Sequence, residues 1–185
     1  MTAPPARKQF TVEDYARMRE TGILTEDDRV ELLDGEIYLM SPIGPVHVAL
    51  VNKLNRILGQ QIGDQGIISI QNPIRLDPRD EPQPDIAILA PRDDFYASAL
   101  ATPDDILLVI EVADTTLTYD REQKLPRYAQ AHIGEVWIID PSAQTIEQYT
   151  NPVQGLYTNR HTVLPGENVR AQNIPSISFT SDRIF

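Results

Sequence analysis

Two acidic residues lie in strongly apolar segments of the chain. Asp85 opens the run Asp85-Ile-Ala-Ile-Leu89, and Glu111 lies near the end of Ile106-Leu-Leu-Val-Ile-Glu-Val112. Burying a carboxylate costs free energy unless it is paired or bound to a metal. If these two segments are neighbouring strands, a shared divalent cation explains both carboxylates. Lys124 follows Glu111 by thirteen positions, in a segment with helical spacing that can fold back over the sheet.

Each of these residues also has a simpler structural explanation. Asp85 follows Pro84 and could simply be the first residue of a strand. Glu111 could form a buried salt bridge with an arginine, and Lys124 alone would most often be a solvated lysine. The order of the three residues against two apolar segments therefore carries more weight than any one of them.

The first half of the chain contains the elements expected to position these groups. Thr11 and Asp14 have the spacing of a capping box, which predicts a short helix over Val12–Thr21 that ends at Gly22. Alternating residues from Arg29 to Met40 flank Asp34-Gly35, a dipeptide typical of a type I′ hairpin. Apolar residues at helical spacing predict a helix over His47–Leu58 that Gly59–Gly66 closes. We expect Val48, Val51, Leu54, Ile57 and Leu58 to form its buried face.

The second half is expected to form most of a sheet. Predicted strands cover 67–76 with a break at Pro73, then 85–89, 106–112, 135–140, 145–150, 156–163 and 174–179. A helix is predicted over 118–132, with a kink at Pro126 or a regular part that begins close to it. These elements indicate an α+β fold with an α/β-like core, in which a mixed central sheet is flanked by helices and extended by β-hairpins. We expect a single domain over residues 10–185 after a flexible tail over residues 1–9.

Composition limits the class of protein further. The chain has 185 residues, no cysteine and a formal net charge of −11, with a pI near 4.6. Thiolate zinc sites and disulfides are therefore excluded. No apolar run approaches the roughly 20 residues that span a bilayer, so we expect a cytoplasmic protein without membrane contact. The acidic charge argues against a protein that coats nucleic acid, but not against a metal site built from carboxylates.

The motifs, taken together, resemble a known superfamily. Pro84-Asp85 followed by Glu111-Val112-Ala113 resembles the signature of PD-(D/E)xK nucleases, although Ala113 replaces the usual lysine. Lys124 is similar to the migrated lysine of some families in this superfamily. The longer pattern resembles the Uma-two family: Asp34-Gly35-Glu36, Ser41-Pro42, His47, Pro84-Asp85, Glu111-Val112, Lys124, Tyr128, and Glu135 to Pro141.

The resemblance implies a restriction endonuclease-like fold and hydrolysis of phosphodiesters with Mg²⁺ or Mn²⁺. Asp85, Glu111 and the carbonyl of Val112 would hold the metal ion, and Lys124 would orient the attacking water or offset charge on the phosphate. His47, at a helix N-terminus, and Glu31, upstream of the motif, would support the site; His47 could instead cap its helix, and Glu31 could be a solvated strand residue. DNA would be the substrate, bound weakly and with strong salt sensitivity. The oligomeric state stays open, although enzymes of this class often pair and a homodimer would fit that habit.

Two other functions stay open at this point. The fold could serve as a catalytically silent binding or assembly module, which the charge of −11 favours. It could also be a metal-dependent hydrolase of a small phosphoester, which needs no basic groove. A serine hydrolase and a P-loop enzyme are disfavoured, because the chain has neither a Gly-x-Ser-x-Gly elbow nor a Gly-Lys-Ser/Thr run.

Overall fold

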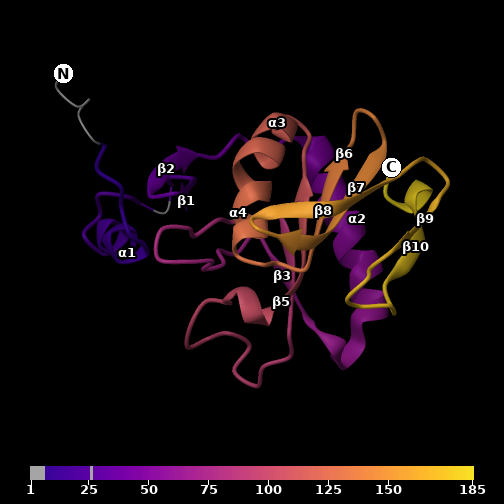
Figure 1. The fold of residues 1–185 in the computed structure, drawn as a ribbon, viewed down its shortest axis with the longest axis horizontal. Helices are drawn as coiled ribbons and strands as arrows, with labels where there is room; N and C mark the ends of the chain where they lie inside the picture. Colours follow the sequence, from indigo (N-terminus) through magenta and orange to yellow (C-terminus); the bar gives the residue numbers. More distant parts are fainter. Residues whose placement is uncertain (1–6, 26) are drawn as a thin grey trace.

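A six-stranded mixed sheet forms the centre of the fold (Figure 1). The structure is a computed structural model that describes residues 7–25 and 27–185. The strand order is β3-β4-β5-β6-β7-β8, and all neighbours are antiparallel except β5 and β6. The strands are β3 (Ile67–Ile70), β4 (Ile86–Leu89), β5 (Ile106–Val112), β6 (Glu135–Asp140), β7 (Thr145–Val153) and β8 (Leu156–Val163). The α+β class with a mixed central sheet, predicted from the sequence, is confirmed.

The parallel pair dictates where the helical crossover runs. Two parallel strands need a long connection, and here it consists of α3 (Leu117–Tyr119), a π-helical segment (Asp120–Lys124) and α4 (Leu125–Gln130). This connection covers one face of the sheet, where Tyr128 and Ile133 are fully buried. Pro126 lies in the first turn of α4, so the regular part of the helix does begin close to it.

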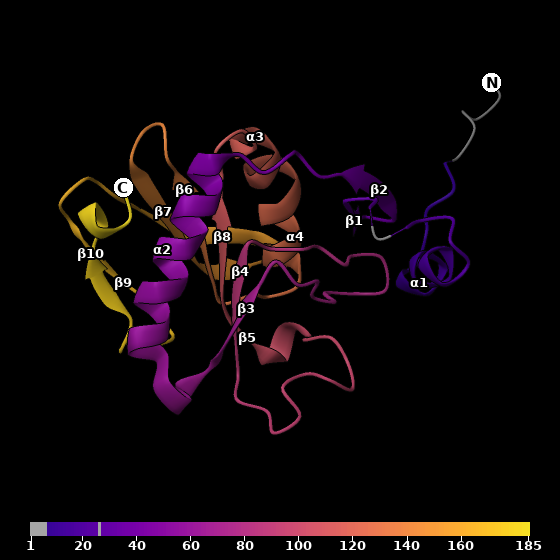
Figure 2. The ribbon, with the colours of Figure 1, turned by 180° about the vertical axis from the view of Figure 1, so that it is seen from behind.

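The long helix α2 (Pro45–Ile62) covers the opposite face together with the C-terminal hairpin of β9 (Asn168–Arg170) and β10 (Ser178–Thr180) (Figure 2). Leu54, Leu58 and the single tryptophan, Trp137, are buried in this layer. The sheet therefore separates two apolar cores. None of the helices among the described residues is long and apolar enough to cross a membrane.

The N-terminal segment forms a small unit at one end of the sheet (Figure 1). It contains α1 (Val12–Glu20) and a hairpin of β1 (Val30–Leu33) and β2 (Glu36–Leu39). The capping box of Thr11 and Asp14 is present, and the turn residues Asp34 and Gly35 both have positive φ, as a type I′ turn requires. Residues 1–6 of the expected flexible tail lie outside the described residues, and residues 7–9 are exposed without regular structure.

Several predicted boundaries are wrong. α2 continues through Gly59 to Ile62, because Ile62 still finds a buried position in the core. Val48 is exposed, and Leu50 takes its expected place on the buried face. β3 ends at Ile70, since Gln71 has φ near +50° and leaves the ladder.

The C-terminal strand is also shorter than predicted. Residues 174–177 form a turn in which the Ile177 amide donates to the Ile174 carbonyl, so only 178–180 are extended. The apolar side chains of Ile174 and Ile177 are buried all the same. These apolar side chains are buried although their backbone is not paired in a sheet, and this is why the sequence predicted a strand here.

Candidate active site

The register of β4 and β5 brings Asp85 and Glu111 together. Ile86 is paired with Ile110, so Asp85 and Glu111 occupy the adjoining positions at the same end of the two strands. The Val112 amide donates to Asp85 Oδ2 at 2.8 Å, and the Asp85 amide lies 3.3 Å from Glu111 Oε2. The two carboxylates therefore lie side by side, as the sequence predicts for a shared cation.

Lys124 reaches these carboxylates from the π-helical segment. Its ammonium lies 2.7 Å from Glu111 Oε1 and 3.4 Å from Glu31 Oε2, and it donates to the Gln83 carbonyl at 3.3 Å. Burial alone would lower the pKa of Lys124, but the charges of Glu111 and Glu31 outweigh it and raise that pKa well above its usual value. The side chain stays a cation although it is only 4% exposed.

The Glu111 carboxyl group is buried and is held by hydrogen bonds. The Tyr128 hydroxyl donates to Oε1 at 2.5 Å, on the same oxygen that Lys124 contacts. Burial raises the pKa of Glu111 to about 8, against the opposing charge of Lys124. The salt bridge of Glu111 is thus with a lysine, and the alternative of a buried arginine partner is wrong.

His47 lies in the first turn of α2, and its imidazole faces Asp85. Nε2 is 2.8 Å from Asp85 Oδ1, and this hydrogen bond raises the pKa of His47. Burial would raise the pKa of Asp85, but His47 and Lys124 outweigh it and lower that pKa. Nδ1 of His47 is buried and has no hydrogen-bond partner among the described residues.

Glu31 comes to the site from β1 of the N-terminal hairpin. Oε1 accepts from the Tyr119 hydroxyl at 2.8 Å, and Oε2 accepts from the Gln83 amide at 2.9 Å. With Lys124 as a third partner, this buried carboxylate joins the hairpin, the segment before β4 and the crossover helix. The N-terminal unit is therefore part of the site.

A single cavity of about 140 Å³ connects all of these groups. Its lining includes every residue that the sequence predicted for the site: Glu31, His47, Asp85, Glu111, Val112 and Lys124. The space is sufficient for a cation with several waters. The mouth is formed in part by Ser41 to Gly44, just before α2. The structure thus brings the predicted residues together and leaves none of them elsewhere in the fold.

Sequence reasoning missed several groups in this cavity. Asp120 and Tyr119 line it from the crossover helix, and Arg29 lines it from the loop before β1. Asp120 precedes Lys124 by four positions, a spacing that places two helical side chains on one face and could have indicated it. Tyr128 is not part of this lining; it is fully buried in the core, and its hydroxyl holds Glu111.

The geometry limits which metals suit the site. No group of three or more histidine, cysteine or acidic side chains in the described part of the chain is arranged as a complete metal cage. Mg²⁺ is commonly held by one or two carboxylates, with waters and substrate oxygens as its remaining ligands. Asp85, Glu111 and a backbone carbonyl are a hard oxygen donor set of that kind.

Comparisons with known proteins agree with this picture of the fold. The sequence pattern of the Uma2 family, described as "Putative restriction endonuclease", matches residues 12–181. A crystal structure of "a putative nuclease belonging to DUF820" from Anabaena variabilis superposes with a TM-score of 0.75 at 16% identity, over 95% of this chain and 97% of that one. No curated protein sequence matches significantly.

Proposed function

Because the chain belongs to the Uma2 family of putative restriction endonucleases, we propose that it is a Mg²⁺- or Mn²⁺-dependent endonuclease that hydrolyses phosphodiester bonds in DNA. One observation carries the proposal. Two carboxylates from neighbouring strands and an ammonium from the crossover helix line the same small cavity, together with a histidine at a helix N-terminus. This is the set of groups that a metal-assisted attack on a phosphodiester needs.

The residues present fit a hard divalent cation. Asp85 and Glu111 would hold it, with the Val112 carbonyl as a further oxygen ligand. When bound, the cation supplies charge neutralisation for the phosphate and a lowered pKa for a water molecule. It would also offset the surplus of acidic groups in the cavity, where five carboxyl groups face Lys124 and Arg29: Glu31, Asp85, Glu111, Asp114 and Asp120.

The protein's own groups divide the remaining work. Lys124 is fixed by its oxygen contacts and contributes positive charge where the phosphate would acquire negative charge. His47 orients the Asp85 carboxylate from the first turn of α2. Glu31 positions Lys124.

The experiment that tests this proposal measures cleavage of single- and double-stranded DNA with Mg²⁺ or Mn²⁺. Asp85→Ala and Lys124→Ala should each lower the rate by roughly 10²-fold or more, since each removes a group that stabilises developing charge. Asp85→Ala should also lose Mn²⁺ binding in calorimetry. Asp64→Ala is the matched control, because Asp64 is exposed beyond the far end of α2. This variant should cleave DNA like wild type. Cleavage that neither site substitution affects would come from a contaminant and defeat the proposal.

The acidic lining of the cavity also supports a second candidate, a hydrolase of small phosphoesters. The chain carries a net charge of −11, which repels a polyanion more than it repels a small ester. An assay with bis(p-nitrophenyl) phosphate separates the two. Turnover of this diester without cleavage of DNA, lost in Asp85→Ala, would favour the small substrate.

A further inference from the structure

Asp120 has an unusual place in the crossover helix. It is the first residue of the π-helical segment, in which the Leu125 amide donates to the Asp120 carbonyl five residues earlier. Such π-type turns are rare and are often found at functional sites. Asp120 and Lys124 are each only 4% exposed, and both line the cavity that holds Asp85 and Glu111. The helix thus directs one carboxyl group and one ammonium group to the same cavity.

The hydrogen bonds of the other acidic groups show which carboxylate oxygens in the cavity already have a donor from the protein. Each carboxylate oxygen of Asp85, Glu111 and Glu31 contacts a donor from the protein. The Lys124 ammonium contacts three oxygens, which matches its three N–H bonds. These four side chains hold one another in place, and the lone pairs that remain on Asp85 and Glu111 are the ones that would hold the proposed cation.

Asp120 differs from them in this respect. Its Oδ2 accepts from the Thr116 hydroxyl at 2.6 Å, but no donor from residues 7–25 or 27–185 reaches Oδ1. This oxygen is not sealed off either, because the buried atoms without partners in that part of the chain are His47 Nδ1 and Arg127 Nε. Asp120 therefore offers a fixed carboxylate with one free oxygen to a water in the cavity.

We propose that Asp120 is a further catalytic residue, whose Oδ1 accepts the proton of the water that attacks the phosphodiester; this rests on the nuclease function proposed above. The water oxygen forms the new bond to phosphorus, and its proton moves to Asp120. The bond from phosphorus to the leaving oxygen breaks, and that oxygen keeps the electron pair and takes a proton from solvent. Asp120 then returns its proton to water, which completes the cycle.

Two features of the surroundings suit this role. Burial raises the pKa of Asp120, with Lys124 opposing, so its carboxylate is a better proton acceptor than an exposed aspartate. Thr116 fixes the orientation of the carboxylate through Oδ2 and leaves Oδ1 directed elsewhere. A carboxylate that only capped the helix would need neither burial in the cavity nor a free oxygen.

The test compares Asp120→Asn with wild type in single-turnover cleavage at saturating Mg²⁺. Asparagine keeps the shape and the acceptor for Thr116 but cannot take up the proton, so the rate should fall by roughly 10²-fold to 10³-fold. Mn²⁺ affinity in calorimetry and the thermal midpoint should stay close to those of wild type. Thr116→Val, which keeps the carboxylate but frees it to rotate, should lose about tenfold. Glu122→Gln, an exposed neighbour on the same segment, should cleave like wild type.

Each other result has a distinct meaning. If wild type cleaves and Asp120→Asn is within about threefold of it, the base assignment is wrong while the nuclease function stands. If Asp120→Asn loses Mn²⁺ affinity together with activity, Asp120 is a metal ligand and the assignment is again overturned. If wild type cleaves no nucleic acid under any of these conditions, the proposed nuclease function fails first and this role falls with it.

Discussion

Glu111 is the residue in which burial and charge compete most directly. Four buried or mostly buried carboxyl groups surround one ammonium in the site, namely Glu31, Asp85, Glu111 and Asp120, with Lys124 at their centre. The cations that line the cavity, Lys124 and Arg29 with His47 when protonated, do not outnumber these carboxylates, and burial penalises each unbalanced charge. Burial raises the pKa of Glu111 to about 8, Lys124 opposes this rise, and the charges of Asp120 and Asp85 add to it.

This imbalance predicts a pH dependence of stability in the metal-free protein. The folded-state pKa of Glu111 lies above its ordinary value of 4.5, so the folded state binds more protons between the two values. The contribution of Glu111 to stability is then fully present below about pH 4.5 and is lost as pH rises through about 8. We expect wild type in EDTA to lose on the order of 2 kcal/mol more than Glu111→Gln between about pH 5 and pH 9. Urea unfolding measures both proteins, and parallel pH profiles would contradict the prediction.

The residues of the site could be predicted to different degrees. Asp85 and Glu111 were predictable because a carboxylate within an apolar strand needs an explanation that its neighbours do not supply. Asp120 was missed although its spacing from Lys124 places both on one helix face, because a helical aspartate looks solvated until the fold shows what covers it. The pairing of His47 with Asp85 also required the structure, since it depends on how α2 packs against the sheet end.

At the scale of elements, short apolar strands and tight turns were the features that the sequence predicted well. β4, β5 and β6 follow continuous apolar runs, and the turn at Asp34-Gly35 follows from the backbone geometry that it requires. The end of α2 and the turn over residues 174–177 were predicted wrongly because their side chains are buried by tertiary packing, which local spacing does not reveal. The order of strands in the sheet likewise depends on contacts between distant segments.

The β1–β2 hairpin carries Glu31 into the site, so its position should affect the site. Substitution of Gly35 in the hairpin turn, compared with substitution of Gly22 outside the hairpin, tests this. Gly35 has φ near +72°, and a Cβ there would lie 2.7 Å from Gln9 Cβ and 2.9 Å from the Phe10 carbonyl oxygen. Gly22 has φ near +74° with nothing within 4 Å. We expect Gly22→Ala to cost about 1 kcal/mol from the backbone conformation alone, and Gly35→Ala to cost at least about 1 kcal/mol more.

Denaturant unfolding of the two variants provides this comparison. Cleavage should fall only in Gly35→Ala, because β1 carries Glu31 and a displaced hairpin would release Lys124 from its second carboxylate. Equal stability losses would show that the turn tolerates displacement of its neighbours. Equal activity with a selective stability loss would show that the hairpin does not hold Lys124 in place.

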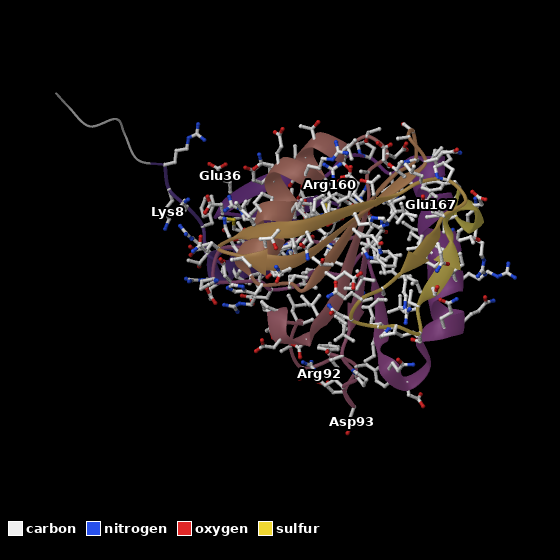
Figure 3. All side chains as sticks on the ribbon, turned by 45° about the vertical axis from the view of Figure 1, so that its right-hand side comes forward. Lys8, Glu36, Arg92, Asp93, Arg160 and Glu167 are labelled. Atoms are coloured by element: carbon white, nitrogen blue, oxygen red, sulfur yellow. The ribbon has the colours of Figure 1, made fainter. Side chains whose placement is uncertain are left out.

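At the scale of the whole molecule, the charge is spread widely and is predominantly acidic. Figure 3 shows acidic and basic side chains around much of the surface, with Arg92 and Asp93 projecting from the loop between β4 and β5 and Arg160 on β8. The net charge of −11 means that any salt or divalent cation relieves some self-repulsion in the folded state. General relief of this kind must be separated from binding at Asp85 and Glu111.

That separation is possible by comparing salt and Mg²⁺ in wild type and Asp85→Asn. NaCl up to about 0.3 M should raise the thermal midpoint of both proteins equally, because screening acts on the whole surface. Mg²⁺ added at that NaCl concentration should stabilise wild type further, by about 2.7 kcal/mol at a concentration near 100 times its Kd. Asp85→Asn should gain little, since asparagine keeps the hydrogen bond from Val112 but lacks the ligand charge. Equal gains in both proteins would mean that Mg²⁺ acts on the surface alone, and a cation at the end of β4 and β5 would then have no support.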